Sequence, residues 1–504
     1  MRPTRRGFLQ TAAGASLLGL GDLGFLSTLP RVSADDARLD PKLVRIQPDI
    51  EPLVRLLEDT PRQKLIEEVG HRVRNGTTYR ELLAALLLAG VRNIQPRPVG
   101  FKFHAVLVVN SAHLASLNSP DEHRWLPIFW ALDNFKNSQA QNEAQGGWRL
   151  KPVDESKVPT ARNANKAFAE AMANWDEAAA DVAAASVARN VGVQEAFREF
   201  ARVGCRDFRD IGHKAIYVAN AFRTLQCIGW QYAEPVLRSL AYALLEHNGD
   251  NPAKRDDPAD RPGRLNLARL AKLPEGWQEG KPDAGATDAV LAVIRDGSEQ
   301  DSCEKVMELL AKGVSPRSIW DGLLCGAGEL LMRQPGIVGL HTLTTANALH
   351  YSYETCEGAD RALMMLQCAA FLPMFHGAMK GRKEAIADVR IDKLEPLVPK
   401  GDALTPTQIF ADVGRDRAKA AAETLGYLKS GGDAKALIDT SRVLTFLKGR
   451  DSHDYKFSSA VLEDYYHVSP AWRDRFLAAG TYWLQGSGAK DNDLVKRTRA
   501  ALQG

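Results

Sequence analysis

The sequence predicts an all-α fold made of two tandem, homologous helical repeats packed about a pseudo-twofold axis. Three observations predict it. Long segments, such as 176–186 and 416–425, combine strong helix formers with apolar residues at helical spacing. The pattern His-x5-Asn-x2-His occurs twice, at 104–113 and at 341–350. Between the copies, residues 248–286 are rich in Pro, Gly and Asp, which is the composition of a linker.

The first 34 residues have the features of a twin-arginine export signal. Arg5-Arg6, followed by Gly-Phe-Leu, precedes a short apolar run, and Val32-Ser-Ala34 has the small residues of a cleavage site. The apolar run is interrupted by Asp22, which disfavours a membrane anchor. We therefore expect cleavage after Ala34 and a periplasmic or otherwise extracytoplasmic protein.

The repeat extends well beyond the histidine motif. Residues 50–139 align without a gap on the residues 237 positions later, and segment 212–217 aligns on segment 452–457 at an offset of 240. Helical periodicity alone would align Leu with Leu, but it would not align His with His several times. The predicted organisation is a signal peptide (1–34), helical repeat 1 (35–247), a linker (248–286) and helical repeat 2 (287–504).

One element of the first repeat is ambiguous by itself. Val106-Leu-Val-Val has the composition of a strand. Its counterpart in the second repeat, Leu343-Thr-Thr-Ala-Asn-Ala-Leu, is typical of a helix. We predict a helix for both, because homologous segments share their structure.

Composition and charge exclude several classes of partner. The chain has 65 Lys and Arg against 62 Asp and Glu, a formal charge of +3, and the signal segment alone carries four arginines and one aspartate. The mature chain is therefore close to neutral, and we expect no nucleic-acid partner. We also expect no membrane span after signal removal.

Cysteine usage argues against a zinc ribbon, because none of the six cysteines forms a Cys-x2-Cys pair. Several lie inside helical apolar patterns, so we expect buried thiols that pack as small hydrophobic residues.

Four histidines occupy matched places in the two repeats: His104, His213, His341 and His453. A single histidine on an apolar face is usually a core residue with a satisfied hydrogen bond. Recurrence in both copies favours a shared role, and a pseudo-twofold axis would bring the four imidazoles to one interface. Four nitrogen donors would suit iron, copper, zinc or nickel, and the four residues are candidate metal ligands or catalytic acid–base groups.

Asn110 and Asn347 are candidate cofactor-binding residues, because they could orient an imidazole or a bound oxygen species. The remaining histidines of the motif, His113 and His350, lie nine residues after the first one, which is half a turn away on an ideal helix. We therefore expect His113 and His350 to point away from the cluster.

Three stretches resemble the questin-oxidase-like family. Segment 340–349 is similar to a Leu-His-x2-Thr helix of that family, and segments 211–218 and 234–247 are similar to its central histidine helix and the apolar helix that follows. Segment 452–462 is similar to its C-terminal acidic-His-x2-Lys motif. The chain departs from the pattern at Asn347 and Tyr217, where the family has histidines.

The resemblance implies a Baeyer–Villiger-type oxygenase that inserts oxygen beside a carbonyl and opens an anthraquinone ring, with NADPH as the donor. The chain has no Rossmann fingerprint outside its signal segment. Our leading hypothesis is an exported, metal-dependent oxidoreductase or oxygenase that acts on a small aromatic or quinone-like molecule. The alternatives are a helical protein that binds a hydrophobic ligand without converting it, and a structural protein whose histidines are core residues.

Overall fold

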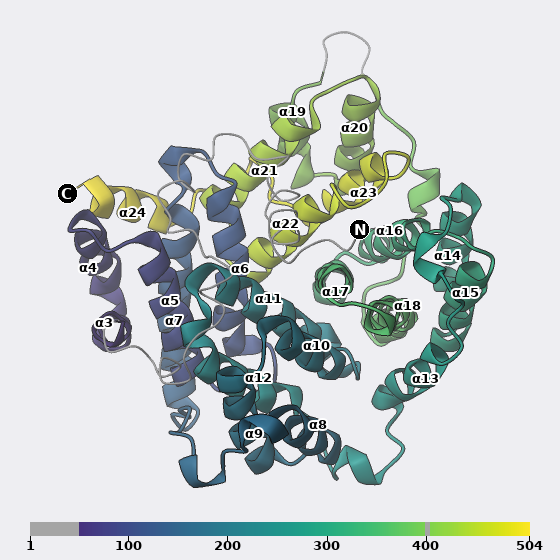
Figure 1. Cartoon of the computed structure of the whole chain (residues 1–504). Coiled ribbons are helices and arrows are strands. Elements are labelled where there is room, and N and C mark those ends of the chain that lie inside the picture. Colours follow the sequence, from purple (N-terminus) through teal and green to yellow (C-terminus); the bar gives the residue numbers. More distant parts are fainter. Residues whose placement is uncertain (1–49, 399–403, 504) are drawn as a thin grey trace, which may run out of the picture.

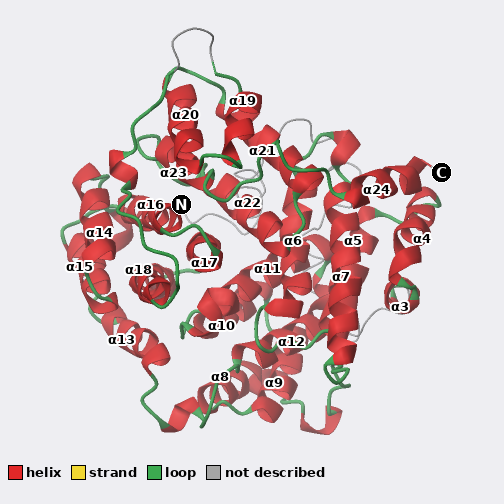
Figure 2. Cartoon of the chain, turned by 180° about the vertical axis from the view of Figure 1, so that it is seen from behind, coloured by secondary structure: helices red, strands yellow, loops and turns green. Residues whose placement is uncertain are grey.

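The computed structural model describes residues 50–398 and 404–503. The signal segment predicted at 1–34 lies outside these residues. Within them every regular element is a helix, joined to the next by loops, and the only β-type pairing is an isolated bridge between Lys281 and Val314 (Figure 2). The predicted all-α class is confirmed, while the internal doubling stays a prediction. Residues 104–117 form one helix, as their counterpart in the second half does, so both were predicted correctly.

The helices of the first half and of the joint follow each other closely along the chain. Their bounds are α3 (Glu51–Asp59), α4 (Arg62–Arg74), α5 (Tyr79–Asn93), α6 (His104–Leu117), α7 (Leu126–Ala144), α8 (Ala164–Asn174), α9 (Glu177–Asn190), α10 (Val193–Gly204), α11 (His213–Ile228), α12 (Ala233–Leu244) and α13 (Arg261–Leu270).

The second half continues in the same way. Its helices are α14 (Ala284–Asp296), α15 (Glu299–Ala311), α16 (Pro316–Arg333), α17 (Ile337–Thr355), α18 (Ala359–Lys380), α19 (Pro406–Val413), α20 (Arg417–Lys429), α21 (Ala434–Lys448), α22 (Ser452–Asp464), α23 (Arg473–Gly480) and α24 (Asp493–Gln503).

Local sequence explains where several of these helices begin. Thr78 with Glu81 caps α5, and Ser298 with Asp301 caps α15, each by a reciprocal pair of hydrogen bonds to the backbone. Asp451 caps α22 in the same manner. Nearly all buried apolar side chains of both halves form one continuous core, so the two halves are held together by the same burial that folds each of them.

Four helices occupy the centre of the molecule: α6 and α11 from the first half, α17 and α22 from the second (Figure 1). They pack in a closed ring, in which α6 contacts α11, α11 contacts α17, α17 contacts α22, and α22 contacts α6. The last helix, α24, returns to the first half and packs on α4 and α7, where Arg497 pairs with Glu67. The ring is the feature that positions the candidate site.

One described helix, α18, is long and apolar enough to cross a membrane, but most of its apolar window is buried against other helices. Core helices of soluble proteins have the same property. The six cysteines are all free, and five of them are buried.

Candidate metal centre

The four predicted histidines all lie near the beginnings of the four central helices. His104 is the first residue of α6, and His213 is the first residue of α11. His453 is the second residue of α22, and His341 is the fifth residue of α17. Because the ring of helices brings these ends together, residues from both halves of the chain meet in one place.

His213 is at the centre of the cluster. Its Nε2 lies 2.9 Å from Nε2 of His104 and 3.0 Å from Nε2 of His341. The ring of His453 lies 4.5 Å from the ring of His104 and 5.2 Å from that of His341, measured between centroids. His213 and His341 are buried, whereas His104 and His453 are half-buried.

Backbone carbonyls fix the orientation of three of these rings. The Nδ1 atoms of His104, His213 and His341 lie 2.9, 2.5 and 2.6 Å from the carbonyl oxygens of Phe101, Asp210 and Ile337, respectively. A carbonyl can only accept, so each Nδ1 donates its proton and each neutral ring keeps a lone pair on Nε2. The Nε2 lone pair of His213 faces those of His104 and His341 at about 3 Å, and these lone pairs repel unless a cation or a shared proton lies between them. This is the arrangement that metal-binding histidines have when their other nitrogen is held by a carbonyl.

The backbone that supplies two of these carbonyls is strained. Phe101 and Asp210 have φ of 47° and 53°, and Ile211 has φ of 47°. Left-handed backbone costs about 1–2 kcal/mol at a residue with a side chain, and more at a β-branched one. Such strain persists only where the surroundings enforce it, and it concentrates at functional sites. Here it aims the Phe101 and Asp210 carbonyls at the rings of the cluster.

His453 is held differently from the other three. Its Nδ1 lies 2.5 Å from Oδ1 of Asp451, the exposed residue that also caps α22. The histidine lowers the pKa of the Asp451 carboxyl, which therefore stays ionised at neutral pH. The buried Nε2 of His453 has no hydrogen-bond partner among the described residues. A carboxylate behind an imidazole makes that imidazole a stronger donor to a metal ion.

A lysine completes the cluster. Lys456 is only 3% exposed, and its Nζ lies 3.4 Å from Nε2 of His213. Burial lowers the pKa of Lys456 to about 7, with weak opposition from Asp451. Lys456 is the lysine of the acidic-His-x2-Lys motif in segment 452–462, but it was not among the predicted site residues. The signal that could have found it is its spacing of three residues from His453, which puts both side chains on one face of α22.

Burial also lowers the pKa of His104, His213 and His341 well below the usual value for imidazole, and the Lys456 amine adds to the effect. These rings are therefore neutral at physiological pH, which is the form that binds metals. His104, His213 and His341 could hold a metal ion, since one nitrogen of each lies within 4.8 Å of the others.

The distances between the Nε2 atoms of the histidines indicate which coordination geometry around a metal ion they fit. At a metal–nitrogen bond of about 2.1 Å, neighbouring ligands are about 3.4 Å apart in a tetrahedron and about 3.0 Å apart at the right angles of an octahedron. The distances of 2.9 and 3.0 Å match the second value. The donor set is all nitrogen, which suits transition ions and not calcium or magnesium.

The two predicted asparagines lie away from the histidine cluster. Nδ2 of Asn110 donates to Oδ1 of Asn220 at 3.3 Å. Nδ2 of Asn347 lies within hydrogen-bond distance of Oε2 of Glu463 (2.9 Å) and Oδ1 of Asp464 (3.0 Å), farther along α22. The contacts of Asn347 therefore belong to a second group of side chains.

His113 and His350 likewise have other partners. Nδ1 of His113 lies 3.0 Å from the hydroxyl of Tyr79, and the ring of His350 packs 4.7 Å from that of His467. Neither belongs to the cluster of four, in keeping with their position half a turn from the first histidine of the motif.

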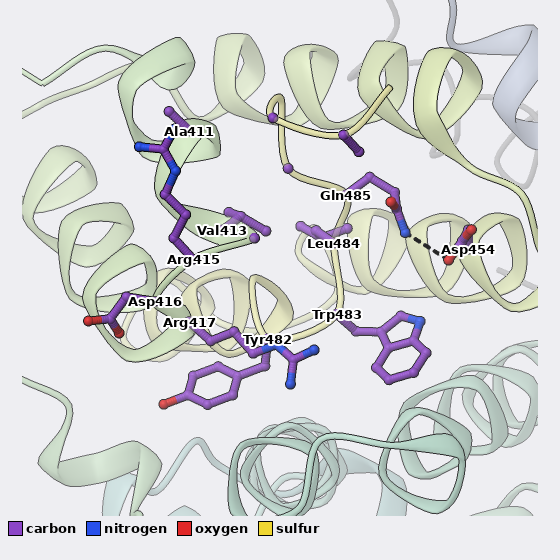
Figure 3. A pocket seen from close by; sticks show the side chains of 14 residues that line it. Ala411, Val413, Arg415, Asp416, Arg417, Asp454, Tyr482, Trp483, Leu484 and Gln485 are labelled. Carbon is purple, nitrogen blue, oxygen red and sulfur yellow. Dashed lines mark hydrogen bonds between the residues drawn. The ribbon is translucent and has the colours of Figure 1, made fainter. Parts of the chain in front are cut away.

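A surface pocket of about 870 Å³ lies in the second half, beside the start of α22 (Figure 3). Its walls include Arg415, Arg417, Tyr482 and Trp483, and it reaches Asp454, whose Oδ1 accepts a hydrogen bond from Gln485 at 2.8 Å. None of the four histidines lines it. Asp454, which follows His453 in the chain, is the one residue lining this pocket that is adjacent in sequence to a histidine of the cluster.

Comparisons with family models, curated proteins and solved structures found no match for the chain.

Proposed function

We propose that the chain is an exported, metal-dependent oxidoreductase, an oxygenase of the questin-oxidase-like kind, acting on a small aromatic or quinone-like molecule. The observation that carries the proposal is the convergence of three Nε2 lone pairs whose rings are locked through Nδ1. A redox-active ion held by His104, His213, His341 and His453 would activate dioxygen.

Support for an apolar substrate comes from the edge of the cluster. Phe101 is 79% exposed and Ile337 is 43% exposed, although large apolar side chains are usually covered. These two residues supply carbonyls that orient His104 and His341. Both exposed apolar side chains thus belong to residues that orient rings of the cluster.

Lys456 supports proton transfer at the same place. A buried amine with a pKa of about 7 can accept a proton and return it near neutral pH, which is what a general base requires. Insertion of one oxygen atom beside a carbonyl also needs two electrons. NADPH as their source rests on the resemblance alone.

The test is elemental analysis of protein purified without added metal, followed by oxygen uptake with hydroxylated anthraquinones. We expect about one redox-active ion, iron or copper, per chain in the wild type, and loss of that ion and of oxygen uptake in His341→Ala. His376→Ala removes a half-buried histidine from α18, outside the cluster, and should retain both. A wild type without a redox-active ion, or a His341→Ala variant with full activity, would refute the proposal. A bound aromatic molecule recovered unchanged under oxygen would favour the binding-protein alternative.

We also propose export by the twin-arginine route. Replacing Arg5 and Arg6 together by lysine should leave the folded protein in the cytoplasm, where cell fractionation detects it. Periplasmic protein at the wild-type level in this variant would contradict the proposal.

A further inference from the structure

A second group of metal-binding side chains lies at the other end of the same two helices. His350, Asp464 and His467 each offer one donor atom, and these atoms all lie within 4.8 Å of one another. His350 follows His341 by nine residues on α17, or about 13.5 Å along the helix. Asp464 is the last residue of α22, and His467 follows it in the next turn, where its N–H donates to the Asp464 carbonyl at 2.9 Å.

Asp464 has an oxygen that nothing in the described chain satisfies. Its side chain is fully buried, and Oδ1 accepts a hydrogen bond from Asn347. Oδ2 is buried without any hydrogen-bond partner. A buried oxygen left in this state destabilises a protein by about 1–3 kcal/mol, and a bound cation removes that penalty.

The neighbouring carboxylate does not compete for a cation. Both oxygens of Glu463 accept from Nη1 of Arg223, at 3.0 and 2.9 Å, so its charge is already matched. The Arg223 guanidinium lowers the pKa of Glu463. Asp464 forms no ion pair among the described residues. Burial and the neighbouring Glu463 carboxylate raise the pKa of Asp464 well above its usual value, so a bound cation would displace a proton from this carboxyl group.

The two histidines are suited to donate lone pairs. Burial lowers the pKa of His350 well below the usual value, and burial also lowers that of His467, so both rings are neutral at pH 7. His350 is fixed by edge-on contact with Trp320 at 4.7 Å. His467 is exposed, so an ion can reach the group from solvent.

We propose that His350, Asp464 and His467 form a second metal site, which binds a divalent transition ion such as zinc independently of the four-histidine cluster. Two imidazoles and one carboxylate are a ligand set that zinc and its neighbours accept, and three protein ligands leave one position open. Asn347 holds the carboxylate in place through Oδ1. This assignment stands or falls separately from the proposed oxygenase activity.

The first half of the chain offers a natural comparison. At the offset of 240, Asp464 corresponds to Thr224 and His467 corresponds to Cys227. His113, which corresponds to His350, lies against the Tyr79 hydroxyl. The first half therefore has no carboxylate at this place, and the proposed site belongs to the second half alone.

The experiment uses the full chain, stripped with a chelator and then dialysed against Zn²⁺ or Co²⁺. We expect two equivalents of bound metal in the wild type, one in His467→Ala, and one in Asp464→Asn. His350→Ala and His113→Ala remove buried histidines from matched positions, so both lose packing, but only His350→Ala should lose an equivalent. His467 is exposed, so its variant should fold normally.

The outcomes separate the two sites. One equivalent that disappears in His467→Ala but persists in His341→Ala supports the second site and contradicts the first. If the wild type binds a single equivalent of metal and His467→Ala still binds it, the second site is overturned. The second site is also overturned if the wild type binds no metal. Two equivalents retained in both His467→Ala and Asp464→Asn also overturn it.

Discussion

The charge of Lys456 should control metal binding at the four-histidine cluster. Its amine faces Nε2 of His213 at 3.4 Å, and burial lowers its pKa to about 7. Above pH 7 the amine is neutral. Below pH 7 it becomes an ammonium that points at the same space as the histidine lone pairs, and it repels a divalent cation.

The pKa of Lys456 sets the size of the effect. If the metal-bound cluster cannot accommodate the ammonium form of Lys456, metal binding below pH 7 must release one proton from that side chain. The apparent affinity for the metal then falls about tenfold between pH 8 and pH 6, which corresponds to about 1.4 kcal/mol. The rings of His104, His213 and His341 do not contribute over this range, because burial keeps their pKa values well below 6.5. The wild type should therefore lose affinity with a slope of one proton.

The assay is competition for Co²⁺ between the protein and a chelator of known pH dependence, followed by absorbance. Lys456→Met keeps most of the side-chain volume and removes the charge, so its affinity should be flat from pH 8 to pH 6. Lys102→Met is the matched control: Lys102 is also buried and near His104 in the chain, but its Nζ donates to Gln145 at 2.8 Å. An equal decline in Lys456→Met and the wild type would refute the reasoning, because the proton would then belong to another group.

Three further predictions concern stability and substrate binding. Burial lowers the pKa of His113 to about 4, below the value of an imidazole in the unfolded chain. The stability that the neutral, buried ring contributes is therefore complete above pH 6.5 and is lost as the pH falls towards 4. Between pH 7 and pH 5, the free energy of unfolding in urea should fall by about 2 kcal/mol more in the wild type than in His113→Gln. Arg223→Met should lower the free energy of unfolding by about 3 kcal/mol, because Glu463 is left without its cation, and Glu463→Gln should restore part of the loss. Phe101→Gly should raise the free energy of unfolding by about 0.5–1 kcal/mol, because φ at this position is 47° and glycine adopts that backbone conformation without strain. The same variant should raise KM for an aromatic substrate if the exposed ring of Phe101 is part of the binding surface.

The sequence contained enough information for the helical class and for the histidine cluster. Helix formers at helical spacing predict helices wherever packing follows the pattern. The matched positions of His104 with His341, and of His213 with His453, predicted that four residues distant in the chain would meet. The four histidines do meet, while the internal doubling that led to this expectation stays a prediction.

Other features of the site could not be predicted from pattern. Asn347 was grouped with the histidines because it belongs to the repeated motif and could orient an imidazole, but six residues move it about 9 Å along the helix, where it meets Glu463 and Asp464. The burial of Lys456 depends on tertiary packing, since lysine is normally solvated. The left-handed backbone at Phe101 and Ile211 contradicts local preference, which is why only the folded protein reveals it.

The charge around the cluster restricts what it can bind together with a metal. His104, His213 and His453 lie in the first turns of their helices, where the partial positive charges of unpaired N–H groups are greatest. Among the described residues, Asp451 is the one anion in direct contact with a ring of the cluster. A divalent ion would then leave at least one positive charge uncompensated, in a region that is already positive. If the cluster holds such an ion, it therefore favours an anionic ligand in the remaining position, and a phenolic quinone that binds as its phenolate would supply that charge where an uncharged aromatic molecule would not.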